Sequence, residues 1–226
     1  MAELRGVIGD LVAPSPLGPL VISCEPTIAM RWLIPRLALF REKNPEFPVH
    51  LLAAGGPIDF ARDRVDLALR RSDFKWPETY HMERIASEWM GPVCIPTLTS
   101  ALTSPAPPRS LQELHARTRP HAWTLWRRQS NISLQLSDTQ HFEHFYLSLQ
   151  AAQAGLGVAM GSIYMVAEDI AAGRLHAPFG FVADQSEYVL LSPVPFSTDE
   201  RRFRFSEWVR YEMQKTCHLL PLSISP

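Results

Sequence analysis

Cysteine is scarce in this sequence of 226 residues, and long hydrophobic runs are missing altogether. The three cysteines, Cys24, Cys94 and Cys217, lie far apart and form no C-x-x-C pair. Such cysteines are typical of a reducing compartment, and their spacing offers no thiolate site for zinc. No stretch approaches the roughly 18 apolar residues of a membrane span. These absences predict a cytoplasmic protein with no metal site and no membrane partner.

An excess of charge of either sign is also lacking. Lysine and arginine together number 22 and aspartate and glutamate 23, which gives a formal net charge of -1. Because a surface that neutralises phosphates needs clustered excess cations, this balance argues against a chain that binds nucleic acid through its own broad basic face. Hydrophobic residues make up 46%, and a chain of this length can bury the core of one large domain or two small ones.

The signatures of common catalytic sites are absent: the sequence has no G-x-S-x-G elbow, no P-loop lysine motif and no H-E-x-x-H pair. Residues 155–161, GLGVAMG, imitate a dinucleotide fingerprint, but they lie between a predicted helix and a predicted strand, which is the wrong order for holding a pyrophosphate. His141 and His144 flank a change from strand to helix, so they point apart and do not form a metal site. We expect neither an enzyme nor a cofactor.

The chain opens with a predicted strand, a tight joint and a helix. An apolar run at 20–24 is followed by Glu25-Pro26-Thr27 and then by apolar residues at helical spacing as far as Phe40. The first N–H groups of such a helix lack partners and carry partial positive charge, so the Thr27 hydroxyl and nearby amides can hold an anion or an acceptor. The alternative is that Thr27 only caps the helix, as threonine usually does there.

The same logic recurs along the chain, because apolar strand patterns alternate with helical ones. We expect strands at 49–53, 65–70, 89–95, 156–160 and 187–192, a short helix at 111–114, a strand or bend at 121–129, and helices at 143–154, 162–172 and from a capping-box pattern at 197–200 onward. Strand and helix in alternation predict an α/β fold with a mainly parallel sheet flanked by helices.

A second joint between strand and helix falls at Glu143 and His144, where both residues can line the same cleft as Thr27. The alternative for Glu143 is an acidic first-turn residue that the helix dipole favours. Most arginines are expected on the solvated surface. Arg70 is the exception, because it ends a predicted sheet strand and is a candidate anion clamp.

Four collinear segments within residues 17–212 carry a further signal: AMRWLIPRL at 29–37, Asp59-Phe60 with VDLALR at 65–70, Pro92-Val93-Cys94, and AAQAGLGVA at 151–159. Together they resemble the effector-binding domain of LysR-type transcriptional regulators, in particular the branch of the glycine-cleavage activator and the beta-lactamase regulators. The resemblance implies a two-lobed fold like the type 2 periplasmic binding proteins, each lobe with a mixed, mainly parallel sheet. Lobe one would comprise 17–95 plus 193–217, and lobe two 96–192.

The resemblance also implies a ligand site between the lobes and a dimer interface. The residues carried over as ligand-binding are Thr27, Gly55, Gly56, Cys94, Ile95, Phe142, Glu143, His144 and Tyr188. Arg31, Trp32 and Arg36 are expected on an outward helix face that packs against a partner subunit. The ligand would be a small metabolite with a carboxylate or amide group. Glu25-Pro26 departs from the small or hydroxylic residues of relatives, so the preferred ligand can differ or an acidic ligand be repelled.

The function implied is that of a ligand-sensing regulatory domain in a homodimer or tetramer, which passes ligand occupancy to a winged helix-turn-helix that binds DNA. Residues 1–16 resemble the end of a linker helix and a turn, and we expect the DNA-binding domain to be absent from this chain. The alternative is a periplasmic-type solute-binding protein of the same fold. It needs an export signal, and prolines at positions 14, 16 and 19 break the apolar helix that a signal peptide requires.

Overall fold

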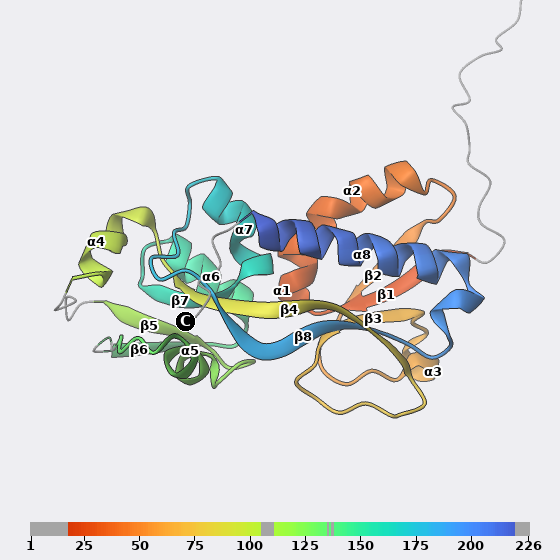
Figure 1. The fold of residues 1–226 in the computed structure, drawn as a ribbon, viewed down its shortest axis with the longest axis horizontal. Coiled ribbons are helices and arrows are strands. Elements are labelled where there is room, and N and C mark those ends of the chain that lie inside the picture. The colour runs from red at the N-terminus through yellow and green to blue at the C-terminus, as the bar shows by residue number, and fades with distance from the viewer. Residues whose placement is uncertain (1–17, 105–110, 135, 137, 220–226) are drawn as a thin grey trace, which may run out of the picture.

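The computed structural model describes residues 18–104, 111–134, 136 and 138–219. The predicted linker remnant at 1–16 lies outside these residues. Figure 1 shows an elongated molecule with helices on both faces of a sheet that runs along the long axis.

The described strands form one eight-stranded sheet, in the order β2-β1-β3-β8-β4-β7-β5-β6. Its strands are β1 (Leu20–Cys24), β2 (Val49–Ala53), β3 (Leu67–Arg71), β4 (His81–Val93), β5 (Gln112–Ala116), β6 (Asp138–Phe142), β7 (Val158–Ser162) and β8 (Val182–Ser192). Strand β1 is parallel to β2 and β3, and β5 is parallel to β6 and β7. Each end of the sheet is therefore a small parallel unit, and the predicted two-lobed α/β class is confirmed.

The two parallel units are joined by the long strands β4 and β8, which pair antiparallel with each other. Strand β8 meets β3 at its carboxyl end, while β4 meets β7 at its own. The register shifts twice along this pair, and Gln185 adopts a left-handed φ of 69° beside the second shift. Both strands pass through both lobes (Figure 1). The predicted lobe limits at 95/96 and 192/193 stay a prediction.

The helices are α1 (Pro26–Ile28), a π-helical turn (Ala29–Leu33), α2 (Ile34–Lys43), α3 (Phe60–Asp63), α4 (Thr99–Leu102), α5 (Ala122–Ser130), α6 (Phe145–Gln153), α7 (Ile163–Ala171) and α8 (Glu200–His218). Short 3-10 turns occupy Pro96–Leu98 and Phe196–Thr198. Helix α8 runs along one face of the sheet beside α2 and ends near α7 (Figure 1). Asp199 caps it by accepting from the Arg201 N–H, so the cap lies inside the predicted capping-box pattern and not at its start.

Two assignments in the second lobe are reversed. The segment predicted as a short helix at 111–114 is strand β5, and the predicted strand or bend at 121–129 is helix α5. The buried carboxylate of Glu113 in β5 pairs with Arg127 of α5, which lets a polar sequence serve as a central strand. In α5, Trp123 and Trp126 lie three residues apart and are both buried, as helical spacing allows.

The predicted outward face of Arg31, Trp32 and Arg36 is wrong, because all three turn toward the protein's own helices. Trp32 is fully buried and its indole N–H donates to the Thr216 hydroxyl at 3.0 Å. Arg31 pairs with Asp169 at 2.5 Å, and Arg36 pairs with Glu168 at 2.6 Å. Arg31 and Trp32 belong to the π-helical turn, in which the Ile34 N–H reaches back five residues to the Ala29 carbonyl. The extra residue rotates all later side chains relative to an ideal α-helix.

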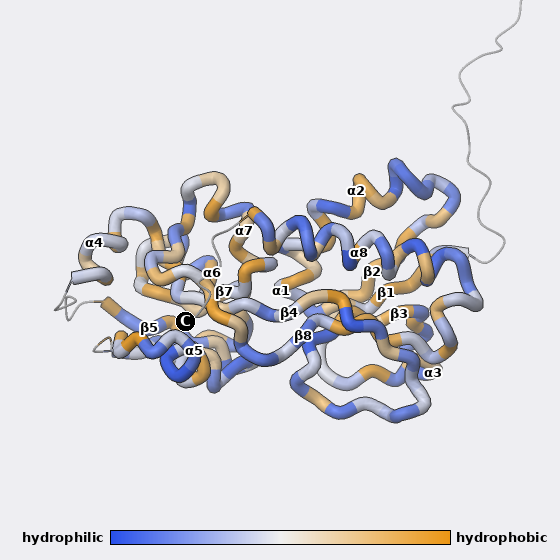
Figure 2. The backbone as a smooth tube through the Cα atoms, viewed as in Figure 1, coloured by the Kyte–Doolittle hydropathy of each residue, from blue (hydrophilic) through white to orange (hydrophobic). Residues whose placement is uncertain are grey.

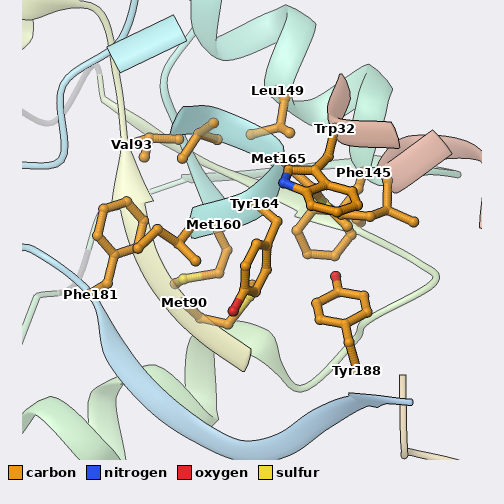
Figure 3. Close-up of a cluster of buried hydrophobic side chains, with 14 of the residues drawn as sticks. Trp32, Met90, Val93, Phe145, Leu149, Met160, Tyr164, Met165, Phe181 and Tyr188 are labelled. Carbon is orange, nitrogen blue, oxygen red and sulfur yellow. The ribbon is translucent and has the colours of Figure 1, made fainter. Parts of the chain in front are cut away.

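The core follows the sheet. Figure 2 shows hydrophobic residues along the strands in the middle of the molecule, with many hydrophilic positions on α8. In Figure 3, Trp32, Tyr164 and Tyr188 gather with Phe145 from α6 near the place where the two lobes meet. The rings of Tyr164 and Tyr188 meet edge to face, with centroids 5.2 Å apart. Such contacts add roughly 0.5–1.5 kcal/mol beyond the area that the rings bury.

Candidate functional site

A cavity of about 450 Å³ lies where the parallel strands of both lobes end. Its walls come from the residues that follow β1, β2, β3, β5 and β6, with one contribution from α7. Carboxyl ends of parallel strands form the usual ligand crevice of open α/β sheets. The lining residues are Glu25, Pro26, Thr27, Gly55, Gly56, Asp73, Phe74, Thr118, Arg119, His144, Phe145 and Met165.

Thr27 lies in this wall and is not the helix cap. The N-cap position of α1 is Glu25, and no side chain caps the helix there. Thr27 is only 6% exposed, and its hydroxyl has no hydrogen-bond partner among the residues that the structure describes. Because Thr27 lines the cavity, its hydroxyl can form a hydrogen bond with a molecule bound there.

Gly55 and Gly56 line the same wall, as predicted from the resemblance. Gly56 has a φ of +75°, a backbone conformation that residues with side chains rarely adopt. Its carbonyl accepts from Nε of Arg70 at 2.9 Å. The remaining Arg70 nitrogens donate to the Ser23 carbonyl and hydroxyl and to the Leu69 carbonyl. Arg70 is thus a buried brace behind the glycine loop and not the predicted anion clamp, because its nitrogens already have protein acceptors.

Arg119 is the cation that reaches the cavity, and sequence reasoning missed it. It follows β5, the strand whose polar sequence predicted a helix, so its position at a strand end was hidden. Its Nη1 donates to Glu88 at 2.9 Å, and its guanidinium lies over the Phe145 ring, 4.9 Å from the centroid. Within the described part of the chain, its Nη2 makes only long contacts, at 3.4 Å to the Tyr188 hydroxyl and 3.9 Å to Glu25. These contacts fix the side chain and leave Nη2 available to a ligand.

Glu88 anchors Arg119 from inside the protein. It belongs to β4, beside the second register shift, and is fully buried. Its carboxylate accepts from Arg119, from the Ser162 hydroxyl at 2.7 Å and from the Trp89 N–H. Burial raises the pKa of Glu88, and the charge of Arg119 opposes that rise. A strand common to both lobes therefore holds the cavity's cation.

The second joint supplies part of what was predicted. His144 and Phe145 line the cavity at the start of α6, where His144 is the N-cap residue. Glu143 points to solvent, with a side chain 63% exposed and 3.7 Å from Arg117. Phe142 ends β6 and is not among the cavity-lining residues. Glu143 also precedes the helix, so neither predicted role for it matches its position.

The remaining predicted residues lie behind or away from the cavity. Tyr188 is fully buried and reaches it only through Arg119. The Cys94 N–H pairs with the His176 carbonyl in an isolated bridge, and burial raises the pKa of its thiol to about 11. Ile95 follows Cys94 and packs near Gly155. Neither Cys94 nor Ile95 lines the cavity.

A smaller cavity of about 270 Å³ adjoins the first and shares Asp73, Thr118 and Arg119 with it.

Across residues 18–104, 111–134, 136 and 138–219, no three His, Cys, Asp or Glu side chains gather as a metal site. No helix in those ranges is long and apolar enough to cross a membrane.

Comparison with known proteins identifies the family. A family model described as the LysR substrate binding domain matches residues 14–214. The transcriptional regulator TrpI of Pseudomonas aeruginosa is 36% identical over 217 residues, which cover 93% of this chain and 73% of TrpI. The glycine cleavage system transcriptional activator of Escherichia coli is 33% identical over 187 residues, which cover 80% of this chain and 60% of the activator. Both relatives are regulators of transcription.

Solved structures share the fold. The effector-binding domain of AmpR from Citrobacter freundii superposes with a TM-score of 0.72 at 24% identity, covering 87% of this chain and 98% of that domain. The effector domain of AmpR from Pseudomonas aeruginosa gives 0.73 at 22% identity, covering 88% of this chain and 98% of that domain. The chain belongs to the LysR family of transcriptional regulators, as a substrate-binding domain.

Proposed function

We propose that this domain senses a small molecule bound in the 450 Å³ cavity between its lobes. The observation that carries the proposal is convergence: Thr27 from the first lobe faces Arg119 and His144 from the second across one cavity. A volume of this size lies within the range of about 300–1,000 Å³ that small-molecule sites occupy. The ligand's groups would contact both lobes at once.

Ligand contact with both lobes supplies a mechanism. A ligand shifts the protein between two arrangements only if it binds one of them better. A molecule held by Thr27 and Arg119 together satisfies this condition, because any change in the angle between the lobes changes one contact relative to the other. In the full regulator, which we place in the cytoplasm, the changed arrangement would pass through a dimer to a DNA-binding domain.

The dimer contact that we propose uses a different face of the opening helix from the one predicted. Met30 and Ile34, four residues apart, are 55% and 51% exposed. Apolar side chains grouped along one helix are candidates for burial against a partner subunit. Ile34→Glu is expected to raise the monomer fraction in sedimentation velocity, whereas Tyr211→Glu on the exposed side of α8 serves as control. Equal sedimentation of both variants and wild type would remove this face from consideration.

The ligand site is tested by a thermal-shift screen against a metabolite library. Compounds that stabilise the wild type are measured again with Thr27→Val and His144→Ala, and with Thr97→Val as a matched control on an exposed turn. Loss of stabilisation in the two cavity variants and its retention in Thr97→Val is the expected result. If every stabilising compound acts equally on all four proteins, the cavity is not the sensing site.

A further inference from the structure

The charged groups around the cavity are unevenly paired. Glu88 is matched by Arg119 at 2.9 Å, and Asp73 is matched by Arg71, also at 2.9 Å. Glu25 makes no hydrogen bond through its side chain within the described part of the chain. Its one ion pair, with Nη2 of Arg119, is 3.9 Å long. The Glu25 carboxylate at the cavity is therefore only weakly compensated by positive charge of the protein.

Glu25 is held facing the cavity. Its backbone carbonyl accepts from the Ala29 N–H at 2.8 Å, which fixes the residue at the start of the helical segment. Its side chain is 23% exposed and lies against Gly55, where an added Cβ would meet Cγ of Glu25 at 3.7 Å. A partly buried carboxylate gains most from a ligand that brings a positive charge.

The groups beside Glu25 have the opposite preference. Among the residues that the structure describes, the Thr27 hydroxyl has no partner and Nη2 of Arg119 has only its two long contacts. A carboxylate would receive charge-assisted hydrogen bonds from Arg119 and a further bond from Thr27. Groups that suit a positive and a negative charge on a ligand therefore line the same cavity, and Glu25 lies 3.9 Å from Arg119.

We propose that the effector is zwitterionic: a free amino acid, or a compound with that head group, whose ammonium binds Glu25 and whose carboxylate binds Arg119 and Thr27. This inference rests on the proposed function and narrows the class of its ligand. Phe74, Phe145 and Met165 give the rest of the cavity an apolar lining suited to a hydrophobic side chain. A carboxylate without an ammonium would instead place one more anion beside Glu25 and Asp73.

The test uses isothermal titration calorimetry on the purified chain with the common L-amino acids. For the aromatic members, the matched probes are L-phenylalanine, 3-phenylpropionate, which lacks the amine, and phenethylamine, which lacks the carboxylate. Glu25→Gln keeps the shape of the side chain and removes its charge. Glu42→Gln, on the exposed surface of α2, is the matched control.

We expect an amino acid to bind at least about tenfold more tightly than either analogue, the effect of losing one charge-assisted contact. Glu25→Gln should erase the preference over the deaminated analogue, while Glu42→Gln keeps it. The inference is overturned if no amino acid binds, if 3-phenylpropionate binds as tightly as L-phenylalanine, or if Glu25→Gln leaves the preference intact. In each case a library compound that still depends on Thr27 and His144 would leave the proposed function standing.

Discussion

Arg70 and Arg119 invite comparison, because each has a nearly buried guanidinium near the carboxyl end of a parallel strand beside the same cavity. Arg70 is 1% exposed, and the Arg119 side chain is 7% exposed. Arg70 donates its hydrogen bonds to backbone carbonyls and to the Ser23 hydroxyl. No carboxylate among the described residues contacts it. Arg119 has a buried carboxylate partner in Glu88 and a nitrogen that faces the cavity.

The difference shows that position at a strand end does not make an arginine a ligand group. Whether an arginine can bind a ligand depends on where its counter-charge and its hydrogen-bond acceptors lie. An arginine whose nitrogens all find acceptors in the protein has none left for a ligand, whereas one anchored at a single nitrogen can present the other. Removing each residue should therefore have a different outcome.

The largest effect is expected from Arg119→Met. This change leaves Glu88 as an uncompensated buried charge, which typically costs about 3–5 kcal/mol in the free energy of unfolding. Urea denaturation monitored by circular dichroism measures it. The double variant Glu88→Gln with Arg119→Met should recover part of the loss. A loss below about 1 kcal/mol, the size of an exposed pair, would contradict the burial of this pair.

Arg70→Met should destabilise the protein less, by about 1–3 kcal/mol, because it leaves buried carbonyl acceptors without a hydrogen-bond donor but leaves no charge unpaired. It should also leave the discrimination between amino acids and their deaminated analogues unchanged, since Arg70 lies behind the glycine loop. Calorimetric titration of the variant checks this. Lost discrimination in a protein of near wild-type stability would make Arg70 a ligand contact after all.

A smaller effect is expected from Ser162→Ala, which removes one hydrogen bond to the Glu88 carboxylate. We expect a loss of about 1.5 kcal/mol, at the lower end for bonds to charged groups, since Arg119 and the Trp89 N–H remain. Ser206→Ala is the control, because this buried hydroxyl donates only to the neutral Phe203 carbonyl in its own helix. Equal losses in urea denaturation would argue that Glu88 is not the charged anchor of Arg119.

The smallest effect is a change of slope with pH. Burial raises the pKa of Glu88, so the folded protein holds that proton more tightly than the unfolded chain. The resulting stability is fully present below the unfolded pKa and is lost as pH rises through the folded value. Stability of Glu88→Gln relative to wild type should therefore increase from pH 4 to pH 8. A constant difference in urea denaturation across that range would contradict a raised pKa.

The sequence was sufficient for the fold class and for part of the site. Alternating strands and helices predicted the α/β architecture, and the resemblance predicted Thr27, Gly55, Gly56 and His144, which all line one cavity. Arg119 was missed because the polar sequence of β5 is typical of a surface helix. Only the structure shows that Arg127 neutralises Glu113 and so allows a buried strand there. The orientation of Trp32 was missed because this helix carries apolar residues on more than one side: Trp32 is buried, whereas Met30 and Ile34 are 55% and 51% exposed.

The pairing of β4 and β8 limits how the two lobes can move. These two strands join the parallel units within the sheet, while helix α8 and the ion pairs Arg31–Asp169 and Arg36–Glu168 also connect the first lobe to α7. Ladder hydrogen bonds resist sliding, whereas the register shifts near Glu88 and the left-handed Gln185 interrupt the ladder and concentrate twist there. The irregular stretch of the sheet that joins the two lobes is thus also the stretch that carries Glu88, the anchor of the cavity cation.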